Sequence, residues 1–173
     1  MAIPDGKLYD DGVMGSGAVA GTGPTTINTE KAGAAVGFGL GVTLSGGKAV
    51  PATTAPIYGV SVRRNYIVGY VLNDAAKDAD AYQEGEAMGV LREGSIAVQI
   101  SSDVEAGDNA TVDATGKFKE AASGDTVVGV FRTAGKAGET AVLQTSFQFG
   151  IVPASAPAAA SAAAGSTSTG TGK

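Results

Sequence analysis

The alternation of apolar and small residues is clearest at residues 35–44, which read AVGFGLGVTL. A strand places alternate residues on opposite faces. One face here would carry Val36, Phe38, Leu40, Val42 and Leu44, and the other would carry Gly37, Gly39, Gly41 and Thr43. Because a bare glycine face needs close packing, the pattern predicts one strand packed tightly, either within its own domain or against another subunit.

Short runs of apolar and β-branched residues recur along the chain and predict further strands. These strands are expected at residues 56–64, 66–72, 86–94, 95–101, 126–134 and 139–149, with Ile96, Val98 and Ile100 on one face. Turn sequences separate them: Gly46–Gly47, Ala-Gly-Asp at 106–108 and Ala-Thr-Gly-Lys at 114–117. The pattern predicts an all-β body of short antiparallel strands, a compact β-sandwich or a β-barrel-like fold.

Three segments differ from this β-rich body, which we place at residues 33–150. Residues 1–32 are rich in Gly, Thr and Asp, and we expect an N-terminal arm lying along a neighbour, or a loop. Residues 73–83 favour a short helix or a long loop, with Asn73 or Asp74 as the N-cap. Residues 151–173 are dominated by Ala, Ser, Thr and Gly, so we expect a flexible tail, with an Ala-rich helix over 157–164 as the alternative.

The composition narrows the classes of partner. Aromatic residues make up only 6% of the 173 residues and glycine contributes 27, so the core is built from small side chains. The net charge of −5 argues against non-specific nucleic-acid binding. The start MAIPDGKLYD lacks the features of a signal peptide, and no apolar stretch approaches the roughly 18 residues of a membrane helix. We therefore expect a soluble chain made in the cytoplasm, with no membrane partner.

The chain offers few groups for catalysis. It has no His and no Cys, which removes the imidazole base, the thiol nucleophile, disulfides and the usual zinc ligands. The acidic candidates are Asp10, Asp11, Asp74, Asp78, Asp80, Glu84 and Glu86. A pair of them could act as in a glycosidase, but the chain has no Trp to line a sugar cleft, so solvated loop charge is the favoured interpretation.

Neither calcium nor a nucleotide is expected as a ligand. The acidic run at residues 74–86 lacks the central glycine of a calcium loop. The glycine patterns at 15–21 and 37–41 do not stand between a strand and a helix, as a dinucleotide fingerprint does. We predict no catalytic residue, no metal ligand and no cofactor.

Four arginines at strand ends are the candidate partner contacts: Arg63, Arg64, Arg92 and Arg132. Arginine is suited to docking on acidic surfaces. The alternative is that these charges only protect strand edges from aggregation. With so few groups for catalysis, a structural or binding component is favoured over an enzyme.

Several motifs in fixed order resemble the structural cement proteins of tailed phages, also called capsid decoration proteins. In chain order they are IYGVSV at 57–62, the pattern G-x-x-x-x-V-L-R-x-G-x-I-x-V at 85–98, V-x-A-G-D-x-A at 104–110, DATGKF at 113–118 and FRTA at 131–134. The resemblance covers about residues 33–145, whereas the Ala/Ser-rich tail departs from the pattern.

The resemblance implies a non-enzymatic protein on the outer surface of a phage capsid. Such proteins bind the major capsid protein at junctions between its subunits, often as trimers, and stabilise the expanded head. We therefore expect a homo-oligomer, with a trimer favoured, and no direct contact with nucleic acid. Two alternatives stay open: another β-rich virion component, such as a head fibre, tail protein or surface-binding module, and a carboxylate-based hydrolase.

Overall fold

The computed structural model describes residues 14–64 and 81–146, and these residues contain strands and turns but no helix. The prediction of an all-β body is thus confirmed. The strands are β1 Thr26–Lys31, β2 Val36–Gly37, β3 Gly41–Ser45, β4 Lys48–Pro51, β5 Gly59–Ser61, β6 Ala81–Tyr82, β7 Ala87–Gln99, β8 Asn109–Val112, β9 Phe118–Glu120, β10 Gly129–Phe131 and β11 Thr140–Ser146.

Strand β7 is the central element of the fold. The main sheet has the order β4-β3-β5-β7-β11-β10-β8-β9, and β1 also pairs with β7. The first half of β7 is flanked by β1 and β5, and its second half pairs antiparallel with β11. Its 13 residues therefore hold two groups of shorter strands together.

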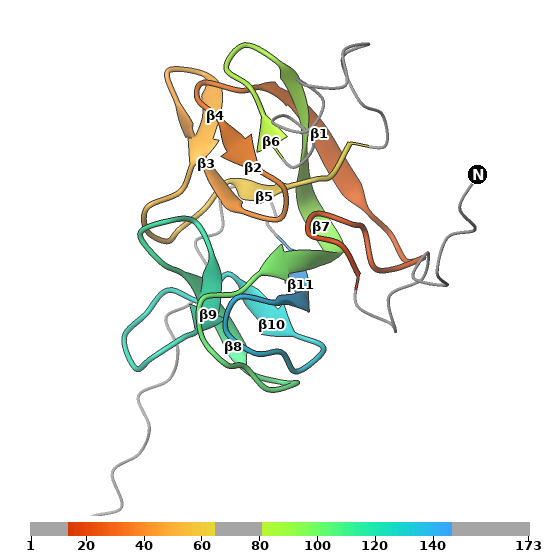
Figure 1. Cartoon of the computed structure of the whole chain (residues 1–173), viewed down its shortest axis with the longest axis vertical. Coiled ribbons are helices and arrows are strands. Elements are labelled where there is room, and N and C mark those ends of the chain that lie inside the picture. Colours follow the sequence, from red (N-terminus) through yellow and green to blue (C-terminus); the bar gives the residue numbers. More distant parts are fainter. Residues whose placement is uncertain (1–13, 65–80, 147–173) are drawn as a thin grey trace, which may run out of the picture.

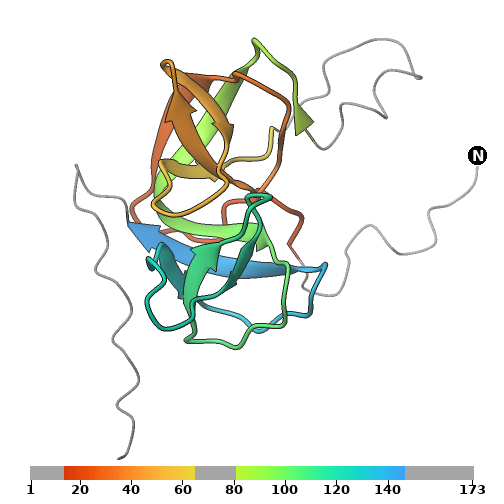
Figure 2. The same ribbon diagram turned by 90° about the vertical axis from the view of Figure 1, so that its left-hand side faces the viewer.

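These two groups lie at opposite ends of β7. Figure 1 shows β2 to β6 gathered at one end, and β8, β9 and β10 at the other, while Figure 2 shows the same division after a quarter turn. The sheet curls back on itself at both ends, through the bridge of Ala32 with Ala49 and the bridge of Ile100 with Phe118. The buried apolar residues form two clusters, one around Met88 and Val90 and the other around Ile96 and Phe131.

The sequence had suggested two strands where β7 is continuous. The pairing of β1 with β7 shifts register opposite Arg92, and Gly94 adopts a φ of +128°. Such a bulge bends a strand without ending it, and the glycine tolerates a conformation that other residues rarely adopt. The predicted common face of Ile96, Val98 and Ile100 is confirmed, since all three lie in one core.

The prediction of a single strand over residues 35–44 is wrong. The chain turns at Phe38–Leu40, so β2 joins β6 in a separate small sheet and β3 joins the main one. Gly39, with a φ of +71°, makes this turn possible, and its N–H donates to Ser61 O at 2.9 Å. The glycines do pack tightly within the chain, because a Cβ at Gly41 would lie 2.9 Å from Val112 Cγ1.

The turn predictions are confirmed. Gly46 and Gly47 connect β3 and β4 with φ values of +57° and +74°. Gly107 and Gly116 also adopt positive φ, at +101° and +81°. The predicted strand cores at 56–64, 126–134 and 139–149 shorten to β5, β10 and β11.

Other predictions fall partly or wholly outside the described residues. The strand expected at 66–72 lies outside them, as do residues 73–80 and the tail at 151–173. Ala81 and Tyr82 form strand β6, so the helix or loop expected over 73–83 is wrong at its end. Strand β1 lies within the expected N-terminal segment 1–32, where the sequence had indicated no strand. Across the described residues, no helix is long and apolar enough to cross a membrane.

Candidate partner-contact surface

Acidic side chains at the β8–β11 end close the turns. Asp108 Oδ2 accepts a hydrogen bond from Glu105 N at 2.7 Å, and Asp125 Oδ2 accepts one from Ala122 N at 3.0 Å. Side chains of this type replace a backbone acceptor in a tight turn. Much of the negative charge is thus part of the architecture.

Two further acids at this end, Asp103 and Asp113, have a pKa below the usual value, which favours their ionised form. The hydrogen bond from Ala137 N and the charge of Lys136 lower the pKa of Asp103. Burial alone would raise the pKa of Asp113, but the hydrogen bonds from Thr115 and Lys117 outweigh it and keep that pKa below its usual value. Neither group is poised to exchange a proton near neutral pH.

The described residues contain no cluster of three or more His, Cys, Asp or Glu that could hold a metal ion. Their buried side-chain polar atoms all have hydrogen-bond partners. Asp10, Asp11, Asp74, Asp78 and Asp80, which the sequence offered as acidic candidates, lie outside these residues.

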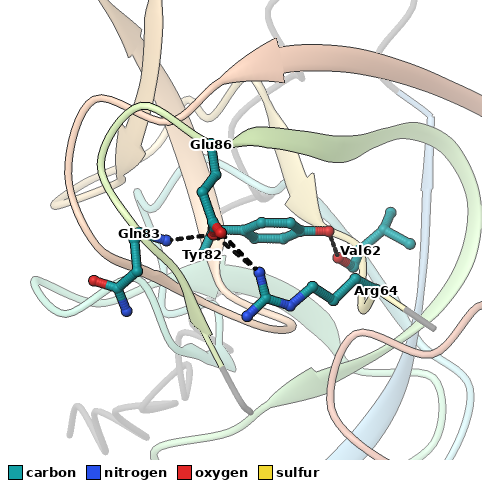
Figure 3. A network of polar contacts seen from close by, with 5 residues as sticks. All are labelled: Val62, Arg64, Tyr82, Gln83 and Glu86. Atoms are coloured by element: carbon teal, nitrogen blue, oxygen red, sulfur yellow. Dashed lines mark hydrogen bonds and ion pairs between the residues drawn. The ribbon is translucent and has the colours of Figure 1, made fainter. Parts of the chain in front are cut away.

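Arg64 is part of an internal network, shown in Figure 3. Its Nη1 lies 2.9 Å from Glu86 Oε2, and its side chain is only 5% exposed. Its guanidinium carbon lies 5.6 Å from the centre of the Tyr82 ring, within the range of a cation–π contact. Tyr82 donates its hydroxyl hydrogen to Val62 O at 2.7 Å. The network joins the segment after β5 to the residues before β7.

Glu86 belongs to the same network. Besides the ion pair, its Oε2 accepts a hydrogen bond from Gln83 N at 2.7 Å. The interpretation of Glu86 as a solvated loop charge is therefore wrong. Glu84 fits that interpretation, since its side chain is 69% exposed and approaches Lys48 only at 4.0 Å.

Arg92 also contacts the chain itself. Its guanidinium carbon lies 4.0 Å from the centre of the Tyr58 ring, and its Nη1 donates to Tyr58 O. Tyr58 in turn donates to Glu30 Oε1 at 2.7 Å and accepts from Asn28 Nδ2 at 2.9 Å. Arg92 thereby holds β7 against the residues before β5 and those of β1.

Arg63 and Arg132 are exposed. The guanidinium of Arg63 lies over Gly15, where an added Cβ would come within 2.3 Å of Nη1. Arg132 Nη1 donates to Ser95 Oγ at 3.3 Å. Neither arginine makes an ion pair within the part of the chain that the structure describes.

Arg132 borders a groove of about 620 Å³. Its lining consists of residues 19–25, Gly94, Ser95, Arg132 and Gln144. The sequence identified Arg132 but not the rest of the groove. The sequence signal for the groove was the run GTGPTT at 21–26, which lacks the pattern of a strand or helix and therefore indicates a loop.

The four arginines thus divide into two pairs. Arg64 and Arg92 stabilise the chain from within, whereas Arg63 and Arg132 are open to a partner. The contacts described above differ among the four. That they contact a partner stays a prediction.

Comparison with known proteins gives a matching family and similar solved structures. A family model described as "Structural cement protein (E217 gp24/Pam3 gp6)" matches residues 9–146. The crystal structure of the head fibre gp8.5 N base in bacteriophage phi29 has a similar fold, with a TM-score of 0.52 and 18% identity. The match covers 72% of this chain and 96% of that one. No curated protein matches the chain.

Proposed function

This chain belongs to the structural cement protein family of phages, and from that membership we propose that it stabilises the expanded head of a phage. It binds the outer surface of the shell at junctions between major capsid subunits and catalyses no reaction. The family match over residues 9–146 is the observation that carries this proposal, because it spans all of the described residues.

The described side chains support a structural role. The acids discussed above accept hydrogen bonds in turns, and Glu86 pairs with Arg64. Such contacts fix the surface loops in place, as a protein that must match a rigid lattice requires. Of the four candidate arginines, the exposed Arg63 and Arg132 are the ones free to contact acidic groups of the shell.

Cement action follows from binding thermodynamics. A ligand that binds only one state of a lattice stabilises that state in proportion to its occupancy and affinity. A subunit that touches several capsomers, or that binds as a trimer, gains avidity from contacts that are individually weak. We propose a homotrimer at the subunit junctions as the arrangement that uses this gain.

A second candidate is a role as the base of a head fibre. The fold similarity to the head fibre base of bacteriophage phi29 favours it. A fibre base would be present in fewer copies and would carry a further protein. Both roles place the chain in the virion.

The test is reconstitution on expanded heads that lack this protein. Purified protein is titrated onto the heads, and both the saturation of binding and the temperature of head rupture are measured. The proposal predicts saturable binding at a simple fraction of the shell subunits and a higher rupture temperature. Binding without stabilisation, or at only a few sites, contradicts it.

A further inference from the structure

Strand β1 leaves part of one edge, around Ile27 and Thr29, without a backbone partner. Ala32 N donates to Glu86 O at 2.8 Å, and in antiparallel pairing the residues that exchange bonds alternate with those that do not. Asn28 and Glu30 therefore bond to β7. The N–H and C=O groups of Ile27, Thr29 and Lys31 point away from it. The parallel bridge of Ala32 with Ala49 takes up the Lys31 carbonyl, and within residues 14–64 and 81–146 no backbone group bonds to Ile27 or Thr29 on this side.

Strand β4 covers this edge at its Ala32 end, and β9 covers the other end of the main sheet. Gly33 N donates to Ala49 O on β4, and Ser101 N donates to Phe118 O on β9. Between Ile27 and Lys31 there is no proline and no bulge, two devices that discourage strand pairing at open edges. The geometry of β1 is suited to an additional strand.

The outer side chains of β1 define which strand would fit. Ile27 is 45% exposed, and its Cγ2 would lie 3.4 Å from a Cβ at Gly89, the same distance as Val62 Cβ. The missing side chain at Gly89 thus leaves Ile27 and Val62 on a shared apolar spot. At the other end of the strand Lys31 is exposed and pairs with no carboxylate of the described residues.

We propose that the outer edge of β1 accepts an extended segment of the shell protein by strand addition. The backbone groups of Ile27 and Thr29 and the N–H of Lys31 supply hydrogen bonds, and side chains at alternate positions supply specificity. The segment carries an apolar residue against Ile27 and an acidic residue beside Lys31. This inference rests on the proposed function, and names the part of the chain that carries it.

A second copy of this chain fits the edge less well. A full-length antiparallel pairing of two β1 strands is centred on Thr29, which places Ile27 opposite Lys31 in both directions. The exposed apolar side chain then gains no apolar partner, and the lysine gains no carboxylate. An apolar and acidic segment of another protein satisfies both.

Hydrogen exchange gives a direct test. The protein is exchanged while bound to expanded heads, then released and quenched, and each amide is read by NMR. Strand addition predicts that Ile27, Thr29 and Lys31 become protected on binding, whereas Asn28 and Glu30 are protected in both states. Protection of all five alike, or of none, overturns the proposal. Protection of the outer three in the free protein, rising with its concentration, assigns the edge to a second copy and also overturns it.

A proline variant supplies the functional test. Thr29→Pro removes an N–H that points outward, and proline is tolerated on an edge strand whose N–H faces solvent. We expect an unchanged melting temperature and a loss of head binding of about tenfold or more, because the backbone bonds near Thr29 are lost. Thr29→Val keeps the N–H and should bind as the wild type does.

The outcomes separate the two claims. If the wild type does not bind heads, the proposed function fails, and the strand addition fails with it. If the wild type binds and Thr29→Pro binds equally well, only the strand addition is overturned. Asn28→Pro is the matched structural control, since its N–H bonds to Val90 and its loss should lower the melting temperature.

Discussion

Arg64 Nη1 lies 2.9 Å from Glu86 Oε2, and this ion pair ties the segment after β5 to the start of β7. The side chain of Arg64 is 5% exposed and that of Glu86 is 28% exposed. The pair is thus sheltered from water on the arginine side, where an unpaired charge would be costly. Arg64, a candidate partner contact, and Glu86, interpreted from the sequence as solvated charge, thus form an ion pair that stabilises the fold.

Replacement of Glu86 by Gln should lower the free energy of unfolding by about 2 kcal/mol, because the buried Arg64 loses its counter-charge. Glu84→Gln is the control, since Glu84 is exposed and only 4.0 Å from Lys48, and it should change stability by less than about 0.5 kcal/mol. Urea unfolding measures both. Equal effects of the two changes would contradict the structural assignment of Glu86.

Acidification should destabilise the fold through Asp113. Its pKa is lower in the folded than in the unfolded chain, so the stabilisation is present above the unfolded value of about 3.9 and is lost as the pH falls through the folded value. Asp113→Asn should be less stable than the wild type at pH 7 and should lose less stability between about pH 5 and pH 2. Parallel pH dependences for the two proteins would contradict this account.

Gly39 should tolerate no side chain. Its φ is +71°, and a Cβ would lie 2.4 Å from Ser16 Oγ and 2.9 Å from Ala97 O. Gly39→Ala should lower the free energy of unfolding by more than about 2 kcal/mol, from backbone strain and overpacking together. Gly47, with a φ of +74° and open space around it, is the control, and Gly47→Ala should cost about 1 kcal/mol.

Arginine substitutions should separate binding from stability. Arg132→Gln should weaken head binding by about fivefold or more without changing the melting temperature, because the side chain is exposed at the groove. Arg92→Met should lower stability by about 1 kcal/mol, since Arg92 stacks on Tyr58. Titration onto expanded heads and thermal melting give the two readouts. If Arg132→Gln weakened head binding only together with a lower melting temperature, the role of Arg132 in binding would be contradicted.

Deletion of residues 151–173 should leave the body folded. Both apolar clusters are built from residues between Ala32 and Leu143, so the deletion removes none of their side chains. Thermal melting of the truncated chain should stay cooperative, with a midpoint close to that of the full chain. A broad transition without cooperativity would contradict the division of the chain at residue 150.

Local patterns predicted the type of structure well and its boundaries poorly. Alternation and glycine turns indicated an all-β body, because both depend on neighbouring residues. The break at Gly39 was not predictable, since it depends on contacts with Ser61 and Ala97 that are distant in sequence. Strand β1 was missed because TINTEK buries no large apolar side chain and so lacks the alternation of a half-buried strand.

The candidate site shows the same limit. Charge and position at strand ends identified four arginines, but only tertiary contacts distinguish the enclosed Arg64 and Arg92 from the exposed Arg63 and Arg132. The open edge of β1 could not be read from the sequence, because an edge is defined by the absence of a neighbouring strand. The pairing of β1 reveals it, because β1 pairs with β7 along its length and meets β4 only at its Ala32 end.

Copy number in purified virions tests the central claim most directly. This chain and the major shell protein are quantified together by mass spectrometry with isotope-labelled standards. The cement account predicts a ratio near one to one, or a simple fraction fixed by the lattice. A few copies per particle would point to a fibre base, and complete absence from the particles would contradict a role in the virion.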